Sequence, residues 1–246
     1  MYDVQKTQVA ILAGGLGTRL RPFTETVPKP MIDINEKPFL EYKINQLKSF
    51  GVRDIVICTG YLGNKIEEYF KNGKKFGVNI SYSPEEKPLG TAGAIKNAES
   101  LIKTNPFILM NGDTYLTLDL NDLFSFHVKK GLPLTLAVSK ATNPTEQELV
   151  KVEDGILSSF YKRGTLEHAA YIEENPAPLI NTGVYVFSKE ILKLIPPKTN
   201  CSLEKDIFPS LAGNIAGFLW EGYMKDLANI QFCNELAEDL LGGKVK

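Results

Sequence analysis

The sequence predicts a three-layer α/β sandwich built on a mostly parallel, mixed central sheet. The chain has 246 residues and is 43% hydrophobic, which is enough to bury a full core without disulfides or structural metals. Short apolar runs alternate with helical patterns through the first half, which is typical of right-handed βαβ units and a parallel sheet. A single domain over residues 1–246 is therefore expected.

The expected elements divide the chain into two halves, about 1–131 and about 132–246. In the first half, predicted strands alternate with predicted helices in the order strand 8–13, helix 39–50, strand 54–59, helix 64–71, strand 78–83, helix 92–103, strand 106–110 and helix 120–130. In the second half, closely spaced strands are predicted at 133–140, 150–153, 156–161, 180–187 and 215–220. A polar, proline-containing loop is expected at 167–178, and helices are expected near 203–212 and 230–241.

Charge and cysteine content exclude several classes of function. The net charge is −1 and no Lys/Arg run occurs, which argues against a nucleic-acid partner. Three cysteines that lie far apart fit neither a disulfide framework nor a zinc site. No stretch approaches the ~20 apolar residues of a membrane span, and the N-terminus lacks a signal-peptide pattern. A cytoplasmic protein without membrane partners is expected, and a homo-oligomer stays open.

The strongest functional signal is the segment 14–31, GGLGTRLRPFTETVPKPM, directly after the first predicted strand. Gly14, Gly15 and Gly17 let backbone N–H groups approach an anion closely, so they predict a phosphate-binding loop. The segment fits neither the P-loop pattern GxxxxGK[ST] nor the dinucleotide pattern GxGxxG. It also carries Arg19, a fork for phosphate oxygens, and Lys29, whose flanking prolines restrict its backbone.

This segment resembles the signature of the sugar-phosphate nucleotidyltransferase family, and within that family the chain most resembles the D-glycero-D-manno-heptose 1-phosphate and mannose 1-phosphate guanylyltransferases. The resemblance implies a Rossmann-like fold of the nucleotide-diphospho-sugar transferase type, with a nucleotide-binding first half and a sugar-phosphate-binding second half. It implies transfer of a nucleoside monophosphate from an NTP to a sugar 1-phosphate, with release of pyrophosphate. It places the following residues on the nucleotide: Leu12, Gly14, Gly15, Gly17, Thr18, Arg19, Glu85, Gly90 and Thr91.

The resemblance also implies a Mg²⁺ site. The family carries one magnesium-binding aspartate in an Asn-Gly-Asp string, which Asp113 matches, and a second near the C-terminus, which Asp226 matches although neighbouring residues differ. Mg²⁺ between two carboxylates can bridge the α- and β-phosphates and neutralise their repulsion. Arg19, Lys29 and Asp113 are the expected catalytic residues, with Arg19 on the leaving pyrophosphate and Lys29 near the α-phosphate.

Glu85 predicts which base is bound. It stands five residues before Gly90, where several thymidylyl- and uridylyltransferases of the family have glutamine. A carboxylate only accepts hydrogen bonds, which suits the N1–H and N2–H₂ donors of guanine. GTP is therefore favoured, while dTTP, UTP and CTP stay open. The alternative for Glu85 is a solvated charge in a Glu-Glu-Lys turn.

The sugar side departs from the family pattern. Asn181 matches the asparagine of the family's N-x-G string, but the usual F-x-E-K-P reads FYKRG at 160–164, so Lys162 replaces the glutamate and Arg163 the lysine. Two cations still suit a phosphate. The expected substrate-binding residues are Asn111, Lys162, Arg163 and Asn181, and the sugar itself stays open.

Two other functions remain as alternatives. A sensing module could keep the fold without catalysis, but retention of Lys29 and Asp113 together argues against it. A transferase for a phosphorylated non-sugar alcohol is disfavoured by the cations at 162–163.

Four polar residues are expected to be structural. His127 is expected to pack or face solvent on a helix, and His168 is expected in the polar loop. Glu204 and Asp206 are expected to cap and solvate a helix that begins after Ser202.

Overall fold

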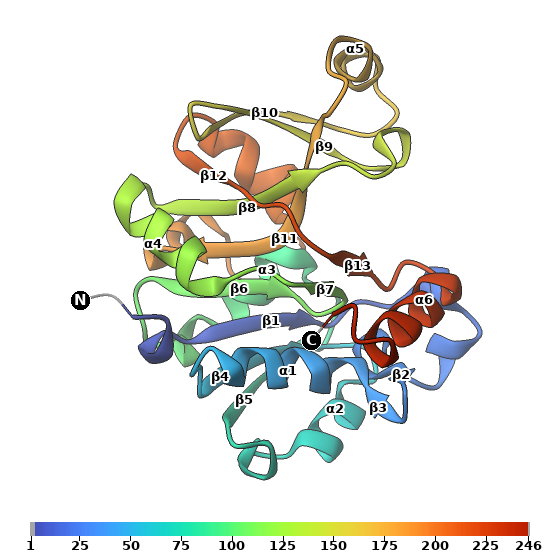
Figure 1. The fold of residues 1–246 in the computed structure, drawn as a ribbon. Coiled ribbons are helices and arrows are strands. Elements are labelled where there is room, and N and C mark those ends of the chain that lie inside the picture. Colours follow the sequence, from blue (N-terminus) through green and yellow to red (C-terminus); the bar gives the residue numbers. More distant parts are fainter. Residues whose placement is uncertain (1–2, 246) are drawn as a thin grey trace.

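The computed structural model describes residues 3–245, and a nine-stranded mixed sheet crosses the whole molecule (Figure 1). Its order is β5-β4-β1-β6-β11-β8-β12-β10-β9, and β10 and β11 run opposite to the other strands. The strands are β1 Val9–Ala13, β4 Asp54–Thr59, β5 Asn79–Pro84, β6 Phe107–Asn111, β8 Leu134–Lys140, β9 Leu149–Glu153, β10 Ile156–Tyr161, β11 Leu179–Phe187 and β12 Ile215–Leu219. The predicted fold class is confirmed, and both predicted halves contribute strands to one sheet.

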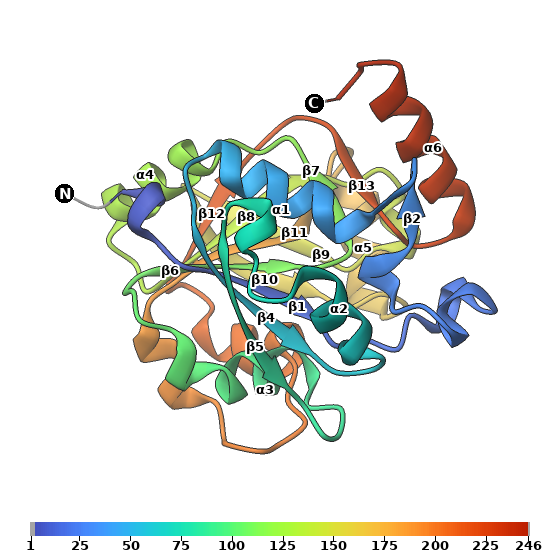
Figure 2. The same ribbon diagram turned by 90° about the horizontal axis from the view of Figure 1, so that it is seen from below.

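Helices cover both faces of this sheet, which makes three layers (Figure 2). The helices α1 (Phe39–Ser49), α2 (Gly63–Phe70) and α4 (Leu120–Lys130) bury their apolar sides in one core. On the other face, α3 (Gly90–Asn97) and short 3-10 and π turns at residues 189–211 enclose a second core. Both faces of the sheet are therefore buried, as expected where parallel strands carry apolar residues on both sides.

The first of these helices shows how local sequence sets the packing. In α1 the buried residues Phe39, Leu40, Lys43, Ile44 and Leu47 recur at helical spacing, so that one side of the helix faces the sheet. A lysine within this otherwise apolar side is unusual, because lysine is rarely fully buried.

A small ribbon lies beside the main sheet and is missing from the sequence predictions. Its strands are β7 (Thr114–Leu116) and β13 (Met224–Asp226), which pair antiparallel so that Thr114 faces Asp226. The helix α6 (Ile230–Leu241) packs against the ribbon through a cluster that includes Tyr115, Leu227 and Leu236 (Figure 1). The ribbon brings two distant segments of the chain to the carboxyl end of β6.

Two short strands and one helix complete the secondary structure that the sequence patterns did not reveal. The strands β2 (Asp33–Ile34) and β3 (Lys37–Pro38) form a tight hairpin. The predicted loop at 167–178 is wrong in its first part, because α5 (Leu166–Glu174) forms there. The Thr165 side chain caps α5 by accepting from the backbone N–H of His168, and the helix buries only two residues, so its apolar signal in the sequence is weak.

Two predicted helices differ in form. The segment predicted at 203–212 is a π turn, η9 (Leu203–Ile207), followed by a 3-10 turn, η10 (Phe208–Leu211). Pro209 in this segment has no backbone N–H to donate to a regular helix. The segment predicted at 92–103 is α3 followed by a 3-10 turn, η6 (Glu99–Leu101). Among residues 3–245, no helix combines the length and apolarity needed to span a membrane.

Candidate active site

A cavity of about 330 Å³ opens at the carboxyl ends of β1 and β6. Ligands of doubly wound sheets bind at this position, and the volume falls in the range of small-molecule sites. Its wall combines segments that are far apart in the sequence and contains most of the predicted nucleotide residues. The predicted site residues in the wall are Leu12, Gly14, Gly15, Lys29, Glu85, Gly90, Thr91, Asn111 and Asp113.

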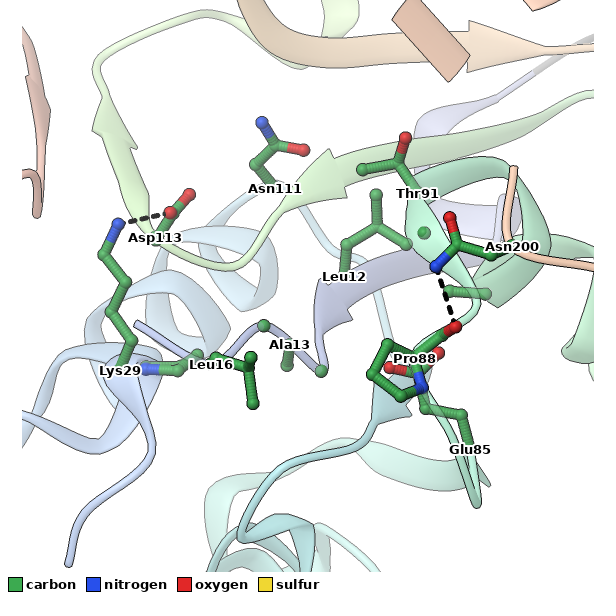
Figure 3. Close-up of a pocket in the computed structure, with 15 residues that line it drawn as sticks. Leu12, Ala13, Leu16, Lys29, Glu85, Pro88, Thr91, Asn111, Asp113 and Asn200 are labelled. Atoms are coloured by element: carbon green, nitrogen blue, oxygen red, sulfur yellow. Dashed lines mark hydrogen bonds and ion pairs between the residues drawn. The ribbon is translucent and has the colours of Figure 1, made fainter. Parts of the chain in front are cut away.

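One end of this cavity is ionic. Lys29 begins the 3-10 turn η4 (Lys29–Met31), and its Nζ lies 2.6 Å from Oδ2 of Asp113, in the turn between β6 and β7 (Figure 3). Both side chains are partly exposed, at 20% and 36%, so a ligand in the cavity can reach them. The backbone N–H of Leu227 donates to the carbonyl oxygen of Asp113 at 2.8 Å, which ties this turn to the segment after β13.

Asp226 lies close to the same pair. Burial raises the pKa of Asp226, the charge of Lys29 opposes this change, and the charge of Asp113 adds to it. Two neighbouring carboxylates, with the charge of one raising the pKa of Asp226, form a suitable place for a cation. Among the described residues no group of three or more His, Cys, Asp or Glu side chains could hold a metal. Asp113 and Asp226 would therefore need phosphate oxygens and waters to complete the ligands of a Mg²⁺ ion, which commonly uses one or two carboxylates.

Lys43 is the residue near this site that sequence reasoning missed. Its side chain is 1% exposed, and its Nζ donates to the carbonyl oxygen of Thr114 at 2.6 Å. Burial lowers the pKa of Lys43 to about 8, while the charge of Asp113 acts in the opposite direction. One turn later Gln46 donates to the carbonyl oxygen of Leu116. Two side chains of α1 thus hold β7, the strand that follows Asp113. The sequence feature that could have revealed Lys43 is its place among the apolar positions of α1.

The opposite end of the cavity carries Glu85, next to Pro88 and Asn200 (Figure 3). Its Oε2 accepts from the backbone N–H of Leu89 at 3.1 Å, and burial raises its pKa. A Cβ at Gly14 would lie 2.6 Å from Oε1 of Glu85, so a larger residue there would displace the carboxylate from this position. The carboxylate is part of the cavity wall rather than a solvated charge in a turn.

Three predicted nucleotide residues lie outside the cavity wall. Gly17 has a left-handed backbone (φ 61°) and precedes the 3-10 turn η2 (Thr18–Leu20), in which Thr18 and Arg19 are exposed. Arg19 still acts on the ionic end, because its charge lowers the pKa of Asp226. These three residues directly follow the cavity-lining residues 14–16, and Arg19 lies within electrostatic range of Asp226.

A second cavity, of about 280 Å³, lies between the far strands of the sheet and the turn η9. Lys162 and Asn181 are in its wall, as expected for a substrate site, and Leu149 and Phe160 supply apolar surface. The other predicted cation does not join them. Arg163 is exposed in the turn after β10, pairs with Glu146 at 3.2 Å and lies outside this cavity wall, so its predicted contact with the sugar phosphate stays a prediction.

A shared wall separates the two cavities. Gly183 has φ 77°, and a Cβ there would lie 2.4 Å from Nδ2 of Asn111, so this glycine lets β11 lie against the end of β6. Asn181 accepts from the backbone N–H of Gly183 at 2.9 Å and donates to the hydroxyl of Tyr185 at 2.8 Å. The N-x-G string therefore builds the wall as well as presenting an asparagine.

The expectations for the structural residues are partly corrected. His127 is a packing residue, with Nδ1 2.9 Å from Oγ1 of Thr135, and burial lowers its pKa to about 4. His168 is not in a loop but on α5, where it is buried. Ser202 caps η9 and Asp206 accepts from its N–H, but Glu204 lies in the second cavity instead of capping. Local sequence suggested a cap because Ser, Glu and Asp together commonly start a helix.

Comparison with known proteins identifies the family of this chain. A family described as Nucleotidyl transferase matches residues 8–223. The chain belongs to the nucleotidyl transferase family. This nucleotidyl transferase is 34% identical to a mannose-1-phosphate guanyltransferase of Yarrowia lipolytica, over 88% of the chain and 59% of the relative. It is 35% identical to a UTP–glucose-1-phosphate uridylyltransferase of Synechocystis, over 82% and 54% of the respective lengths. The chain thus spans under two thirds of these relatives.

Solved structures with a similar fold include proteins that bind nucleotides or nucleotide sugars. HddC from Yersinia pseudotuberculosis, complexed with GMP-PN, is 29% identical and superimposes with a TM-score of 0.80 over 95% of this chain and 99% of HddC. A UDP-glucose pyrophosphorylase complexed with UDP-glucose superimposes with a TM-score of 0.79 over 96% of this chain and 99% of that protein, at 20% identity, which shows a shared fold. The predicted family and fold are confirmed.

Proposed function

We propose that this nucleotidyl transferase transfers a nucleoside monophosphate from an NTP to a sugar 1-phosphate, giving an NDP-sugar and pyrophosphate. The observation that carries the proposal is the Lys29–Asp113 pair, with Asp226 beside it, at one end of a nucleotide-sized cavity. A second cavity with a lysine and an asparagine adjoins it, which suits a phosphorylated, hydroxyl-bearing substrate.

The reaction needs few chemical groups from the protein. A phosphate oxygen of the sugar 1-phosphate attacks the α-phosphorus, and pyrophosphate leaves in line with the attack. Mg²⁺ held by Asp113 and Asp226 would supply charge neutralisation at the phosphates. Lys29 can pass from Asp113 to an α-phosphate oxygen as the nucleotide binds, and Arg19, whose charge acts on Asp226, can bind the leaving pyrophosphate.

GTP is the favoured nucleotide. Glu85 lies at the end of the cavity opposite the ionic pair, where the base would lie if the phosphates occupy the ionic end. Its carboxylate can accept from guanine, and the GMP-PN bound to HddC is also a guanine nucleotide. UTP is the second candidate because the similar Synechocystis protein is named a uridylyltransferase. An NDP-sugar of this kind would serve polysaccharide synthesis.

The test is a matrix of substrates. GTP, UTP, dTTP, CTP and ATP are each combined with mannose, heptose and glucose 1-phosphates in Mg²⁺, and pyrophosphate release and product mass are measured. We expect release with at least one pair, fastest with GTP, and none in EDTA. Nucleotide binding without pyrophosphate release for any pair would instead favour a sensing module.

A further inference from the structure

The second cavity contains a carboxylate that the sequence pattern does not reveal. Lys162 and Lys205 give the cavity two cations, and Glu148 and Glu204 give it two carboxylates. Glu148 is exposed at the rim, whereas Glu204 is half-buried. The string at 160–164 has lysine at the position where the resemblance implies a sugar-binding glutamate. The cavity therefore regains a carboxylate from a different segment of the chain, the turn η9.

Glu204 is held firmly on one side. Its Oε2 accepts from Oγ1 of Thr91 at 2.9 Å and from Oγ of Ser202 at 2.8 Å. The same Thr91 hydroxyl accepts from the backbone N–H of Leu203 at 2.8 Å. A carboxylate fixed by two hydroxyls loses little further freedom on binding a ligand, which favours selective recognition.

The other oxygen of Glu204 keeps room for a ligand. Within the described residues, Oε1 has one partner, the hydroxyl of Tyr185 at the long distance of 3.4 Å. Burial raises the pKa of Tyr185, so the phenol keeps its proton and donates. Its oxygen in turn accepts from Nδ2 of Asn181 at 2.8 Å. Since a carboxylate oxygen has two lone pairs, Oε1 can accept a further hydrogen bond from the cavity.

We propose that Glu204 is a specificity-determining residue that accepts a hydrogen bond from a sugar hydroxyl of the sugar 1-phosphate, next to Asn181. This inference rests on the proposed function. Lys162 and Lys205 lie in the same cavity and can hold the phosphate of that substrate. Because Thr91 also lines the nucleotide cavity, its bond to Glu204 fixes the distance between the sugar-binding group and the nucleotide.

The charge of Glu204 limits the class of sugar. A carboxylate next to the sugar ring favours neutral sugars with a free hydroxyl donor and repels a second carboxylate. The enzyme should therefore accept a neutral hexose or heptose 1-phosphate and reject the corresponding uronic acid 1-phosphate.

The experiment compares Glu204→Gln with wild type. Glutamine keeps the size of the side chain and an oxygen that can accept from Thr91, but it removes the charge. Steady-state kinetics are measured separately for GTP and for the preferred sugar 1-phosphate. Mannose 1-phosphate binding is measured by calorimetry. Glu173→Gln, an exposed substitution on α5 outside both cavities, is the matched control, and Glu148→Gln tests the competing carboxylate.

We expect Glu204→Gln to lower kcat/KM for the sugar 1-phosphate about tenfold or more with little change for GTP, since a charge-assisted hydrogen bond is lost. One monodeoxy sugar 1-phosphate should show a similar loss with wild type and no further loss with Glu204→Gln, because both changes remove the same contact. Discrimination against a uronic acid 1-phosphate should weaken. Glu173→Gln should behave as wild type.

Other results would overturn the inference. If Glu204→Gln leaves sugar-phosphate kinetics unchanged, or if only Glu148→Gln alters them, Glu204 does not contact the sugar, although the proposed function stands. If wild type releases no pyrophosphate but binds mannose 1-phosphate through Glu204, the inference stands and the proposed function fails. If wild type neither reacts with nor binds a sugar 1-phosphate, both are wrong.

Discussion

Replacing Lys43 by methionine tests whether the buried cation of α1 serves the site rather than stability. Methionine has a similar length and no charge, so it can fill the same space. The change removes the donor to the carbonyl oxygen of Thr114 and leaves Asp113 without the cation behind its turn. Folding and activity should respond differently to this loss.

The two effects on folding nearly cancel. Burial lowers the pKa of Lys43 from 10.5 to about 8. At about 1.4 kcal/mol per pH unit, keeping the ammonium charged at pH 7 costs the folded state about 3 kcal/mol, which methionine recovers. A lost hydrogen bond from a charged donor costs about 1.5–3 kcal/mol. The free energy of unfolding at pH 7 should therefore change by less than about 2 kcal/mol.

Activity should fall clearly. The strand held by Lys43 follows Asp113 directly, and a shift of about 1 Å in a reacting group can cost on the order of 10²-fold in rate. We expect kcat/KM to drop by about ten- to a hundredfold. We also expect the variant to need a higher Mg²⁺ concentration for activity, and this need should account for the larger part of the drop. Lys43→Gln keeps a neutral donor and should recover part of this loss.

The pH dependence of stability gives a second readout. Between about pH 8 and 10.5 the unfolded lysine is protonated while the folded one is not, so the unfolded state binds more protons and wild type gains stability as the pH rises. Urea unfolding of both proteins at several pH values should show wild type gaining about 3 kcal/mol relative to Lys43→Met across this range. A constant difference, a large destabilisation at pH 7, or unchanged kcat/KM would refute this reasoning.

Four further substitutions test other parts of the site and core. Asp113→Asn should keep the fold and lower kcat about 10²-fold or more, because a ligand charge is lost, and equal activity in EDTA and in Mg²⁺ would contradict it. Glu85→Gln should weaken the preference for GTP over UTP by about 1–3 kcal/mol, and a wild type that prefers a pyrimidine nucleotide would disprove this role. Lys162→Ala should lower kcat/KM for the sugar 1-phosphate about ten- to a hundredfold, because Lys162 lines the second cavity. Arg163→Ala should leave it unchanged, because Arg163 is in a surface ion pair, and equal effects of the two changes would place both residues on the substrate. Burial lowers the pKa of His127 from 6.5 to about 4, so as the pH falls the unfolded state takes up a proton before the folded state does. The free energy of unfolding of wild type, measured with urea, should therefore fall by about 3 kcal/mol relative to His127→Gln between pH 6.5 and pH 4. Parallel pH profiles of the two proteins would exclude this.

The sequence alone was sufficient for the fold class and the family, and it singled out many of the residues that line the first cavity. These features depend on interactions within a few residues: glycines that permit close backbone approach, prolines that restrict Lys29, and an apolar strand that ends at Asn111. Strand ends in a parallel sheet meet at one edge, so the residues that follow β1 and β6 could be placed together from their order along the chain.

Only the tertiary structure decided which side chains enter the cavities. Lys162 and Arg163 are neighbours with the same charge, yet one lines the cavity and the other pairs with Glu146. The local sequence predicts that Glu204 caps a helix, whereas in the structure it accepts a hydrogen bond from Thr91, which is distant in the chain. Lys43 interrupts the apolar side of α1, and only the packed structure shows its partner, the carbonyl oxygen of Thr114 in β7. Local sequence sets backbone conformation through short-range sterics and hydrogen bonds, whereas a side chain's partners depend on which distant segments the packed core brings beside it.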